Sequence, residues 1–385
     1  MSKDAKNVPA LRFKGYSDAW EKRKLGDLGS VAMNKRIYKD QTSDEGEIPF
    51  YKIGSFGKQA DAFISRKLFN EYKKLYPFPK KGDILISASG SIGRTIVYNG
   101  EDAYFQDSNI IWIQHDNRLD NTFLHQLFNI IRWSGVEGTT IKRLYNKNIL
   151  STQILLPSVE EQRSIGNLLD NVDNLIAATQ HNIDALEQAK KALLQRLFDQ
   201  SWRFKGYSDP WEKRKLGEVA TITMGQSPDS KNYTLNPQDH ILVQGNADIK
   251  NGWVEPRVWT TQITKIAKKG SVLLSVRAPV GEVSKTAFDV VLGRGVASVG
   301  QTDFLYQYLI TLKINGFWLR YSTGSTFDSI NSADIKDAII FLPEKNEQSR
   351  IAKTLNCIDN LIAATQSRLS SLELLKKALL QDLFI

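Results

Sequence analysis

Two stretches of the chain carry apolar residues at alternating spacings of three and four positions. The first stretch starts at Leu169 and the second at Leu355, 186 residues later. This spacing predicts two long helices whose apolar positions form a coiled-coil seam of about three to four heptads each. The predicted seam residues are Leu169, Val172, Ile176, Ile183, Leu186, Leu193 and Leu197 in the first helix, and Leu355, Ile358, Ile362, Leu369, Leu372, Leu379 and Leu383 in the second.

Polar residues interrupt the two seams at matching slots. Thr179 and Lys190 stand in the first seam, and Thr365 and Lys376 stand in the second. A polar residue in such a seam is a known means of fixing register. Two matched seams in one chain favour pairing of the helices with each other. The alternative is that each is an ordinary amphipathic helix packed on its own domain.

The rest of the chain shows short apolar runs bounded by glycine, serine and proline, which is typical of strands in a mixed domain. Lys-Gly precedes the run Ile84–Ile86 and also the run Val272–Leu274, and each run leads into a loop rich in small residues. A last strand is predicted just before Pro157 and again just before Pro343. The pattern predicts two α/β blocks, one before each long helix.

The chain is a tandem repeat. RFKGYSDAWEKRKLGD at residues 12–27 returns as RFKGYSDPWEKRKLGE at residues 203–218, with 14 of 16 positions identical. LIAATQ and KKALLQ also occur twice, once in each helical block. The repeat divides the chain into five segments: residues 1–19, 20–157, 158–202, 203–343 and 344–385. Two related blocks with different sequences suggest one task performed on two different targets.

Charge adds a candidate partner. The 385 residues carry a formal net charge of +9, and the excess lies on the two variable blocks, with 20 Lys and Arg against 15 Asp and Glu in residues 20–157 and 15 against 12 in residues 211–343. A basic surface favours polyanions such as nucleic acid. The single cysteine, Cys357, excludes an internal disulfide and fits the cytoplasm. No signal peptide or membrane-spanning run is evident.

Motifs for catalysis are missing. The sequence has no P-loop, and Gly293-Arg294-Gly295 lacks the third glycine of a dinucleotide-binding loop. Asn236-Pro237 is not followed by the aromatic residue that an amino-methyltransferase uses to stack a flipped base. The four histidines have no metal-ligand spacing. We therefore expect a DNA-binding protein with no catalytic or metal site. The alternatives are a coiled-coil scaffold and a DNA methyltransferase or nuclease with unrecognised motifs.

The order of these motifs resembles that of the specificity subunits of type I restriction-modification systems. The matching pieces are Pro9–Phe13 with Trp20 and Leu25-Gly26, the Lys-Gly-Asp-Ile-Leu run, the Pro-x-x-x-Glu-Gln entries ending at Gln162 and Gln348, and the closing Lys-Lys-Ala-Leu-Leu-Gln and Leu-Phe. Together they cover essentially the whole chain. The second copy departs from the pattern at Ser271, where the first has an aspartate.

The resemblance implies an α+β fold with an internal pseudo-two-fold repeat. Two globular α/β target recognition domains would be separated by two long helices that form an antiparallel coiled coil. Each domain would read half of a split site in double-stranded DNA. The partners implied are two methyltransferase subunits and the restriction/translocase subunits. The chain itself would bind no cofactor, and the complex would use S-adenosylmethionine, ATP and Mg²⁺ through those partners, in the cytoplasm.

Candidate DNA-reading residues are polar and basic side chains on predicted loops, because base edges and phosphates are contacted by such groups. In the first domain they are Lys35, Arg36, Ser87, Ser89, Ser91, Arg94, Thr139, Thr140, Lys142, Arg143 and Tyr145. In the second domain they are Gln226, Ser227, Gln244, Asn246, Ser275, Arg277, Arg294, Ser325 and Thr326.

The basic runs Lys22–Lys24 and Lys213–Lys215 are a different case, since they are identical in both copies. An identical sequence cannot distinguish two half-sites, so we expect these runs to contact phosphates or a shared protein partner. Trp20 and Trp211 occupy the same slot of the repeat and are predicted to be core or docking aromatics.

Overall fold

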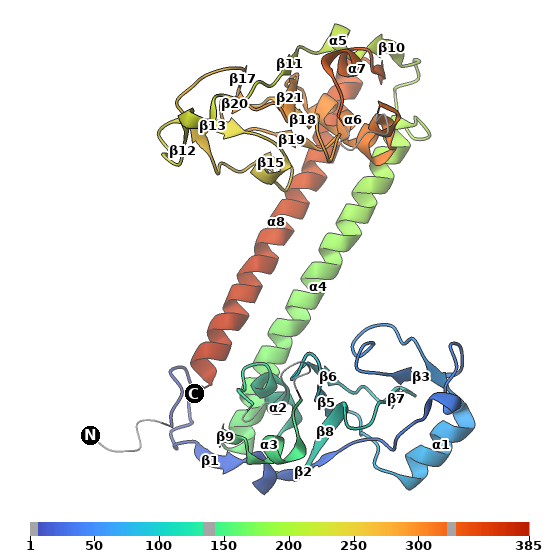
Figure 1. The fold of residues 1–385 in the computed structure, drawn as a ribbon, viewed down its shortest axis with the longest axis vertical. Coiled ribbons are helices and arrows are strands. Elements are labelled where there is room, and N and C mark those ends of the chain that lie inside the picture. Colours follow the sequence, from blue (N-terminus) through green and yellow to red (C-terminus); the bar gives the residue numbers. More distant parts are fainter. Residues whose placement is uncertain (1–6, 134–142, 322–328, 385) are drawn as a thin grey trace. The chain divides into compact units, whose positions relative to one another are not determined.

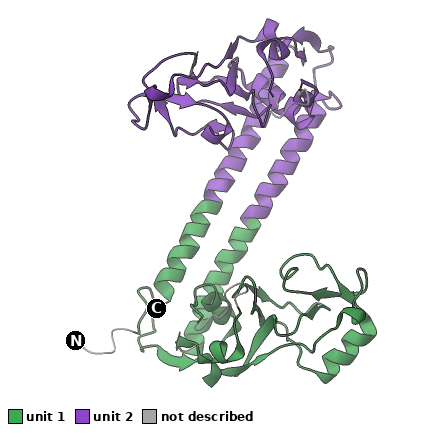
Figure 2. Ribbon diagram, in the orientation of Figure 1, with its two compact units in different colours: residues 1–178, 369–385 green, residues 179–368 purple. Residues whose placement is uncertain are grey.

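A computed structural model describes residues 7–133, 143–321 and 329–384 of the chain. These residues form two compact units (Figure 2): unit 1 contains residues 1–178 and 369–385, and unit 2 contains residues 179–368. Each unit takes in part of both long helices, whereas the five segments predicted from the repeat keep each helix whole. The difference arises because each helix packs against a different α/β body at each of its two ends.

Among its described residues, unit 1 has three sheets and three short helices beside its parts of the two long ones. The first sheet pairs β1 (Glu21–Lys24) with β9 (Gln153–Leu156). The second has the order β2 (Gly29–Ala32), β8 (Ile110–His115), β5 (Ile84–Ser87), β6 (Thr95–Val97), and the third has the order β4 (Phe63–Ile64), β3 (Ile48–Tyr51), β7 (Tyr104–Phe105). The helices are α1 (Arg66–Leu75), α2 (Asn121–Phe128) and α3 (Asn146–Ser151), with short 3-10 turns at Leu25–Asp27 and Lys39–Gln41.

Unit 2 repeats this plan with longer sheets. β10 (Glu212–Lys215) pairs with β22 (Ile339–Leu342) as β1 does with β9. The second sheet has the order β11 (Ile222–Met224), β21 (Val296–Val299), β18 (Val272–Ser275), β19 (Val283–Lys285), β15 (Trp253–Val254), β14 (Ile249–Lys250). The third sheet has the order β12 (Tyr233–Thr234), β16 (Trp259–Thr260), β13 (His240–Val243), β20 (Val290–Leu292), β17 (Ile266–Ala267).

The helices of unit 2 are α5 (Leu216–Val219), α6 (Asp303–Ile314) and α7 (Ser332–Lys336), with 3-10 turns at Ser230–Asn232, Asn246–Asp248 and Phe317–Tyr321. The predicted strands after the two Lys-Gly pairs are confirmed as β5 and β18, and every residue in both is buried. Burial on both faces explains why these strands appear in the sequence as unbroken apolar runs rather than as an alternation.

The two predicted long helices are α4 (Val159–Phe198) and α8 (Lys345–Leu383), and they lie side by side within each unit (Figure 1). Every predicted seam residue is buried or partly buried, while Leu175, which lies off the seam, is exposed. In unit 1, Leu169 of α4 shares a core with Leu383 at the end of α8. In unit 2, Leu197 of α4 shares a core with Leu355 near the start of α8. The pairing is therefore antiparallel, as expected.

The seam lysines form ion pairs across the two helices. Lys376 of α8 lies 2.6 Å from Asp173 of α4 in unit 1, and Lys190 of α4 lies 2.5 Å from Asp359 of α8 in unit 2. The two pairs are equivalent in the repeat. Because a lysine in the seam must reach a carboxylate on the other helix, each pair favours one register over its neighbours.

Aromatic residues fill equivalent places in the two cores. Trp20 packs edge-on against Phe123 and Phe384 in unit 1, and Trp211 packs edge-on against Phe198 and Phe304 in unit 2. Both tryptophans are buried, so of the two predicted roles, core or docking, they have the core position.

The repeated segment is anchored to the start of a long helix by a buried ion pair. Arg12 donates two hydrogen bonds, of 2.7 and 2.8 Å, to Glu161 in the first turn of α4. Arg203 donates the equivalent bonds, of 2.9 and 2.6 Å, to Glu347 in the first turn of α8. Both glutamates are 1% exposed, so the charges are held away from water.

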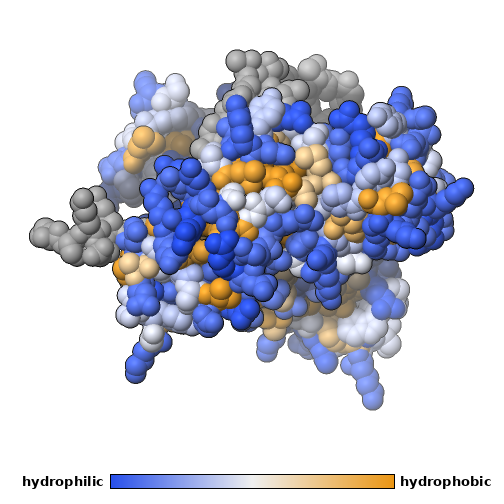
Figure 3. Space-filling model, turned by 90° about the horizontal axis from the view of Figure 1, so that it is seen from below, coloured by the Kyte–Doolittle hydropathy of each residue, from blue (hydrophilic) through white to orange (hydrophobic). Residues whose placement is uncertain are grey.

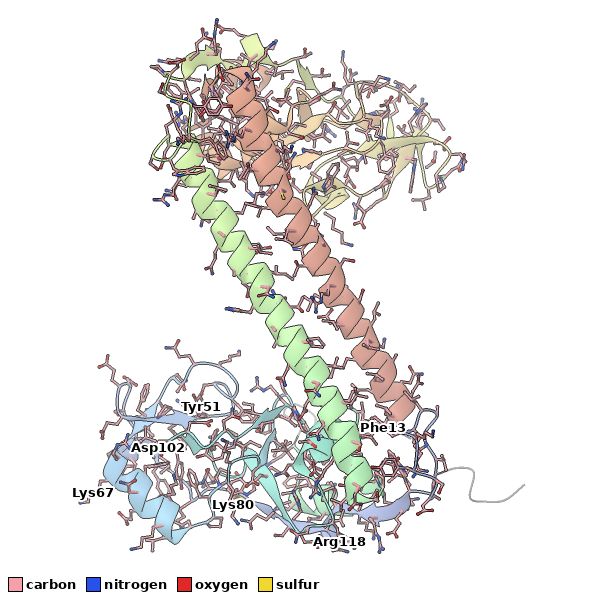
Figure 4. The ribbon with its side chains drawn as sticks, turned by 180° about the vertical axis from the view of Figure 1, so that it is seen from behind. Phe13, Tyr51, Lys67, Lys80, Asp102 and Arg118 are labelled. Carbon is pink, nitrogen blue, oxygen red and sulfur yellow. The ribbon has the colours of Figure 1, made fainter. Side chains whose placement is uncertain are left out.

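The segment before β1 also contacts the other helix. Leu11 N–H donates to Asp382 O at the end of α8, and Phe13 lies beside that end of the helix (Figure 4). The same contact in unit 2 joins Trp202 to Arg196, within one continuous piece of chain. In unit 1 this hydrogen bond joins two segments that are far apart in sequence. In unit 2 the equivalent hydrogen bond joins residues of one continuous segment.

The face of unit 1 that is seen from below is mostly hydrophilic, with hydrophobic residues in small, separate patches (Figure 3). Among the described helices, none is long and apolar enough to cross a membrane.

Candidate nucleic-acid interface

The loops after β5 and β18 share one backbone frame. Ser87 N–H donates to Arg94 O at 2.9 Å, and Ser275 N–H donates to Glu282 O at 2.8 Å. Each loop closes at a glycine, Gly93 or Gly281, with φ of 81° and 87°. Only glycine adopts such a φ readily. The frame is therefore kept in both units while the residues inside it change.

A bulky side chain packs against each of these glycines. A Cβ on Gly93 would lie 2.9 Å from Trp133, and a Cβ on Gly281 would lie 2.6 Å from Trp318. The glycines are therefore required for space as well as for conformation, and they fix where the two loops stand on their sheets.

In unit 1 the side chains of this loop are largely engaged within the protein. Ser87 is fully buried, and its hydroxyl donates to Ser91 O and accepts from Arg94 N–H. Ser89 donates to Asn109 at 2.9 Å. The hydroxyls of Ser87 and Ser89 therefore stabilise the loop in this conformation, whereas Ser91 is exposed.

The predicted basic residues of unit 1 are partly engaged too. Arg94 donates to Ile53 O at 3.2 Å and lies over the Phe56 ring. The other contacts are between Arg36 and Asp107 at 2.9 Å, Lys35 and the Tyr76 ring at 5.0 Å, and Arg143 and the Tyr145 ring at 5.7 Å. Thr139, Thr140 and Lys142 lie outside the described residues.

In unit 2 the predicted residues converge on one cavity of about 310 Å³, at the ends of β13 and β18 and between β20 and β21. Its lining residues are Ser227, Tyr233, Gln244, Gly245, Asn246, Ser275, Arg277, Ala278, Arg294 and Gly295. Six of these were predicted from the sequence. Gln226 is next to the cavity in the chain but does not line it, and Ser325 and Thr326 lie outside the described residues.

Glycines allow the strands around this cavity to approach closely. A Cβ on Gly225 would lie 2.1 Å from Gly293 O, and a Cβ on Gly295 would lie 2.1 Å from Gln244 O. Both distances are too short for any side chain, so glycine is required on steric grounds. Gly293-Arg294-Gly295 thus holds Arg294 beside Gln244 at the cavity.

Asp248 organises the loop that carries Gln244 and was not predicted. Its buried carboxylate accepts N–H groups from Gln244 at 2.8 Å and from Gly245 at 3.3 Å, and it pairs with Arg257 at 3.1 Å. An aspartate at the third position of a short helical turn is a capping signal. The run Gly245–Asp248 contains that signal in the sequence. The signal predicts the turn but not the cavity.

The basic strands that are identical in the two copies are exposed. Every residue of β1 and β10 is exposed. Arg23 pairs with Glu21 and Arg214 pairs with Glu212, at 2.8 and 2.6 Å. Lys215 also pairs with Asp337, and the hydrogen bond raises the pKa of Lys215. A surface kept in both copies suits a shared contact but not discrimination between two targets, and the shared contact stays a prediction.

Comparison with known proteins points to one family. The chain is 28% identical over 393 residues to the putative MjaX type I restriction enzyme specificity subunit of Methanocaldococcus jannaschii, a match that covers 94% of this chain and 92% of that protein. It is 52% identical over 169 residues to a putative type I restriction enzyme specificity subunit of Haemophilus influenzae. This second match spans 43% of the chain and 44% of the relative.

The fold has also been observed before. The crystal structure of the S subunit of a type I restriction-modification system from M. genitalium aligns with a TM-score of 0.68 and 16% identity, over 98% of this chain and 99% of that one. A structure concerned with complex assembly and conformational transition of a type I system aligns with a TM-score of 0.54 and 23% identity, over 95% and 97%. A family model, the type I restriction modification DNA specificity domain, matches residues 17–188 and 208–374. With most of both repeats matched, the chain belongs to the type I restriction-modification DNA specificity family and is a specificity subunit with two such domains.

Proposed function

We propose that each unit reads one half of a bipartite DNA site. The observation that supports this is the shared frame around β5 and β18, on which the two units carry different polar side chains. The shared frame places both loops in the same way on their sheets. The different side chains would give each loop a different base preference. Unit 1 carries an exposed Ser91, while unit 2 carries Arg277 and Arg294.

The chemistry is proposed to belong to partner subunits. The chain would direct methylation by two methyltransferase subunits and cleavage by restriction/translocase subunits, which would bring S-adenosylmethionine, ATP and Mg²⁺. The duplicated segments at residues 12–27 and 203–218 support two equivalent partners, because two equivalent surfaces suit two equivalent ligands. One of the similar solved structures concerns the assembly of a type I complex.

The first experiment is methylome sequencing of a host with and without the chain. We expect a split motif that disappears when the chain is deleted. Exchanging residues 20–157 for the first block of another family member should alter only one half of that motif. A change in both halves would contradict independent reading by the two units.

The second experiment separates reading from catalysis. The purified chain, given DNA and S-adenosylmethionine, is expected to bind DNA with a strong salt dependence and to transfer no methyl group. Methyl transfer by the chain alone would identify an enzyme, and the absence of salt-dependent binding would favour a scaffold. Mass measurement of the assembled complex should give two methyltransferase subunits per chain; one per chain would count against the proposal.

A further inference from the structure

The cavity of unit 2 has a distinctive chemical make-up. Its ten lining residues include two arginines and no aspartate or glutamate. The guanidinium groups of Arg277 and Arg294 make no hydrogen bond or ion pair with any residue in the described ranges, and both side chains are exposed. Each arginine is held in place by its main chain alone: Arg277 O accepts from Ser275, and Arg294 N–H donates to Ser227.

Exposed arginines elsewhere in the chain are commonly paired. The pairs include Arg36 with Asp107, Arg66 with Asp102, Arg118 with Asp116 and Arg163 with Asp120. The N–H donors of a paired guanidinium are already hydrogen-bonded to a carboxylate. Among the described residues, Arg277 and Arg294 keep theirs available, and two like charges on one small cavity with no acidic lining residue attract an acceptor-rich or anionic ligand.

Two amide side chains add a second kind of recognition group. The side-chain amide of Gln244 also has no partner among the described residues, while Asn246 donates to Pro279 O at 3.2 Å and keeps a buried oxygen without a donor. Amides offer both donors and acceptors, which suits a base edge and exceeds what a phosphate needs. Arginine pairs with the O6 and N7 acceptors of guanine in the major groove through two parallel bonds.

We propose that Arg277 and Arg294 read guanine bases in the half-site of unit 2, an inference that rests on the proposed function. The glycines around the cavity fix the main-chain positions of the two arginines, and Asp248 positions the Gln244 loop beside them. The half-site of unit 2 therefore contains guanine at the positions that these two side chains reach.

The test uses the assembled methyltransferase complex with Arg277→Ala or Arg294→Ala, read by methylome sequencing. Each variant should lose preference for guanine at one position of one half-site by about 5- to 150-fold, with the other half-site unchanged. Arg294→Lys keeps the charge but not the bidentate geometry, so it should also relax that position. Both arginines are exposed, so the melting temperature should stay at the wild-type value.

Lys231→Ala is the matched control, because Lys231 is 79% exposed in the same unit and does not line the cavity. It should leave the motif intact. The proposal is overturned if neither arginine variant changes the motif, or if both weaken methylation at all sites equally and reduce the salt dependence, which is the behaviour of phosphate contacts. If deletion of the wild-type chain leaves the methylome unchanged, the proposed function itself fails, independently of the arginines.

Discussion

Replacing Glu161 with glutamine removes one charge from the buried pair that anchors the first repeated segment to α4. The side chain of Glu161 is 1% exposed and that of Arg12 is 13% exposed, so the carboxylate is shielded from water and the guanidinium is largely shielded. Glutamine keeps the shape but offers only one acceptor oxygen, and its NH₂ group faces the donors of Arg12. The Nη1 nitrogen of Arg12 is already buried without a partner among the described residues, so the variant leaves further donors unsatisfied.

The expected cost is large for a single substitution. Removing one partner of a buried ion pair costs about 3–5 kcal/mol, because the other charge stays buried without compensation. A domain is stable by only about 5–15 kcal/mol. For a unit of this size, each kcal/mol lowers the melting temperature by roughly 2–4 °C, which predicts a fall of roughly 6–20 °C.

Calorimetry of the whole chain measures this loss, and hydrogen exchange localises it. Exchange should rise in the segment around Arg12 and at the start of α4. The control is Glu160→Gln, a neighbouring charge in the same first turn that is exposed. Glu347→Gln should give the same loss with faster exchange in unit 2. If Glu161→Gln destabilises the chain no more than Glu160→Gln does, the pair does not anchor the segment.

Three further outcomes are expected. A double-mutant cycle on Lys376 and Asp173, measured by urea unfolding, should give a coupling energy of about 0.5–3 kcal/mol, and zero coupling would mean that the pair does not set register. Gly281→Ala should destabilise the chain by more than Gly270→Ala. Both glycines have a positive φ, which costs an alanine about 1–3 kcal/mol, but of the two only Gly281 is packed against a side chain. Equal losses of stability would refute the steric role. Asp248→Asn should relax the methylation motif at the position that Gln244→Ala also relaxes, while a motif unchanged from wild type would show that the carboxylate does not position the loop.

The helices and their seam could be predicted because their signal is periodic and long. Every third or fourth residue from Leu169 to Leu197 faces the same way on a helix, and the second copy tests the pattern again. The strands β5 and β18 could be predicted from unbroken apolar runs after Lys-Gly. The short strands of unit 2, such as β14 and β15, left no such signal, because two-residue strands are shorter than any period.

The candidate site was predictable as a set of residues but not as a cavity. Polar residues on loops were recognisable as candidates, yet whether a side chain is free depends on partners distant in sequence. Ser89 is held by Asn109, while Arg277, its equivalent in the repeat, has no such partner among the described residues. Asp248 was missed because a capping aspartate looks the same in any turn. Close packing around Gly225 and Gly295 also depends on tertiary approach, which spacing alone does not show.

One bridge shows how the main-chain frame is kept separate from the side chains that it carries. In unit 1 the main chain of Ser89 bridges that of Arg143, and in unit 2 the main chain of Arg277 bridges that of Ser329. The same backbone bridge thus carries one serine and one arginine in both units, with the sides exchanged. Because the bridge is made by peptide groups, either side chain fits on either side without loss of the main-chain bridge. Substitution at such positions changes the side chains that the loop carries while the sheet below stays the same, so two repeats of one fold can present different groups at equivalent positions.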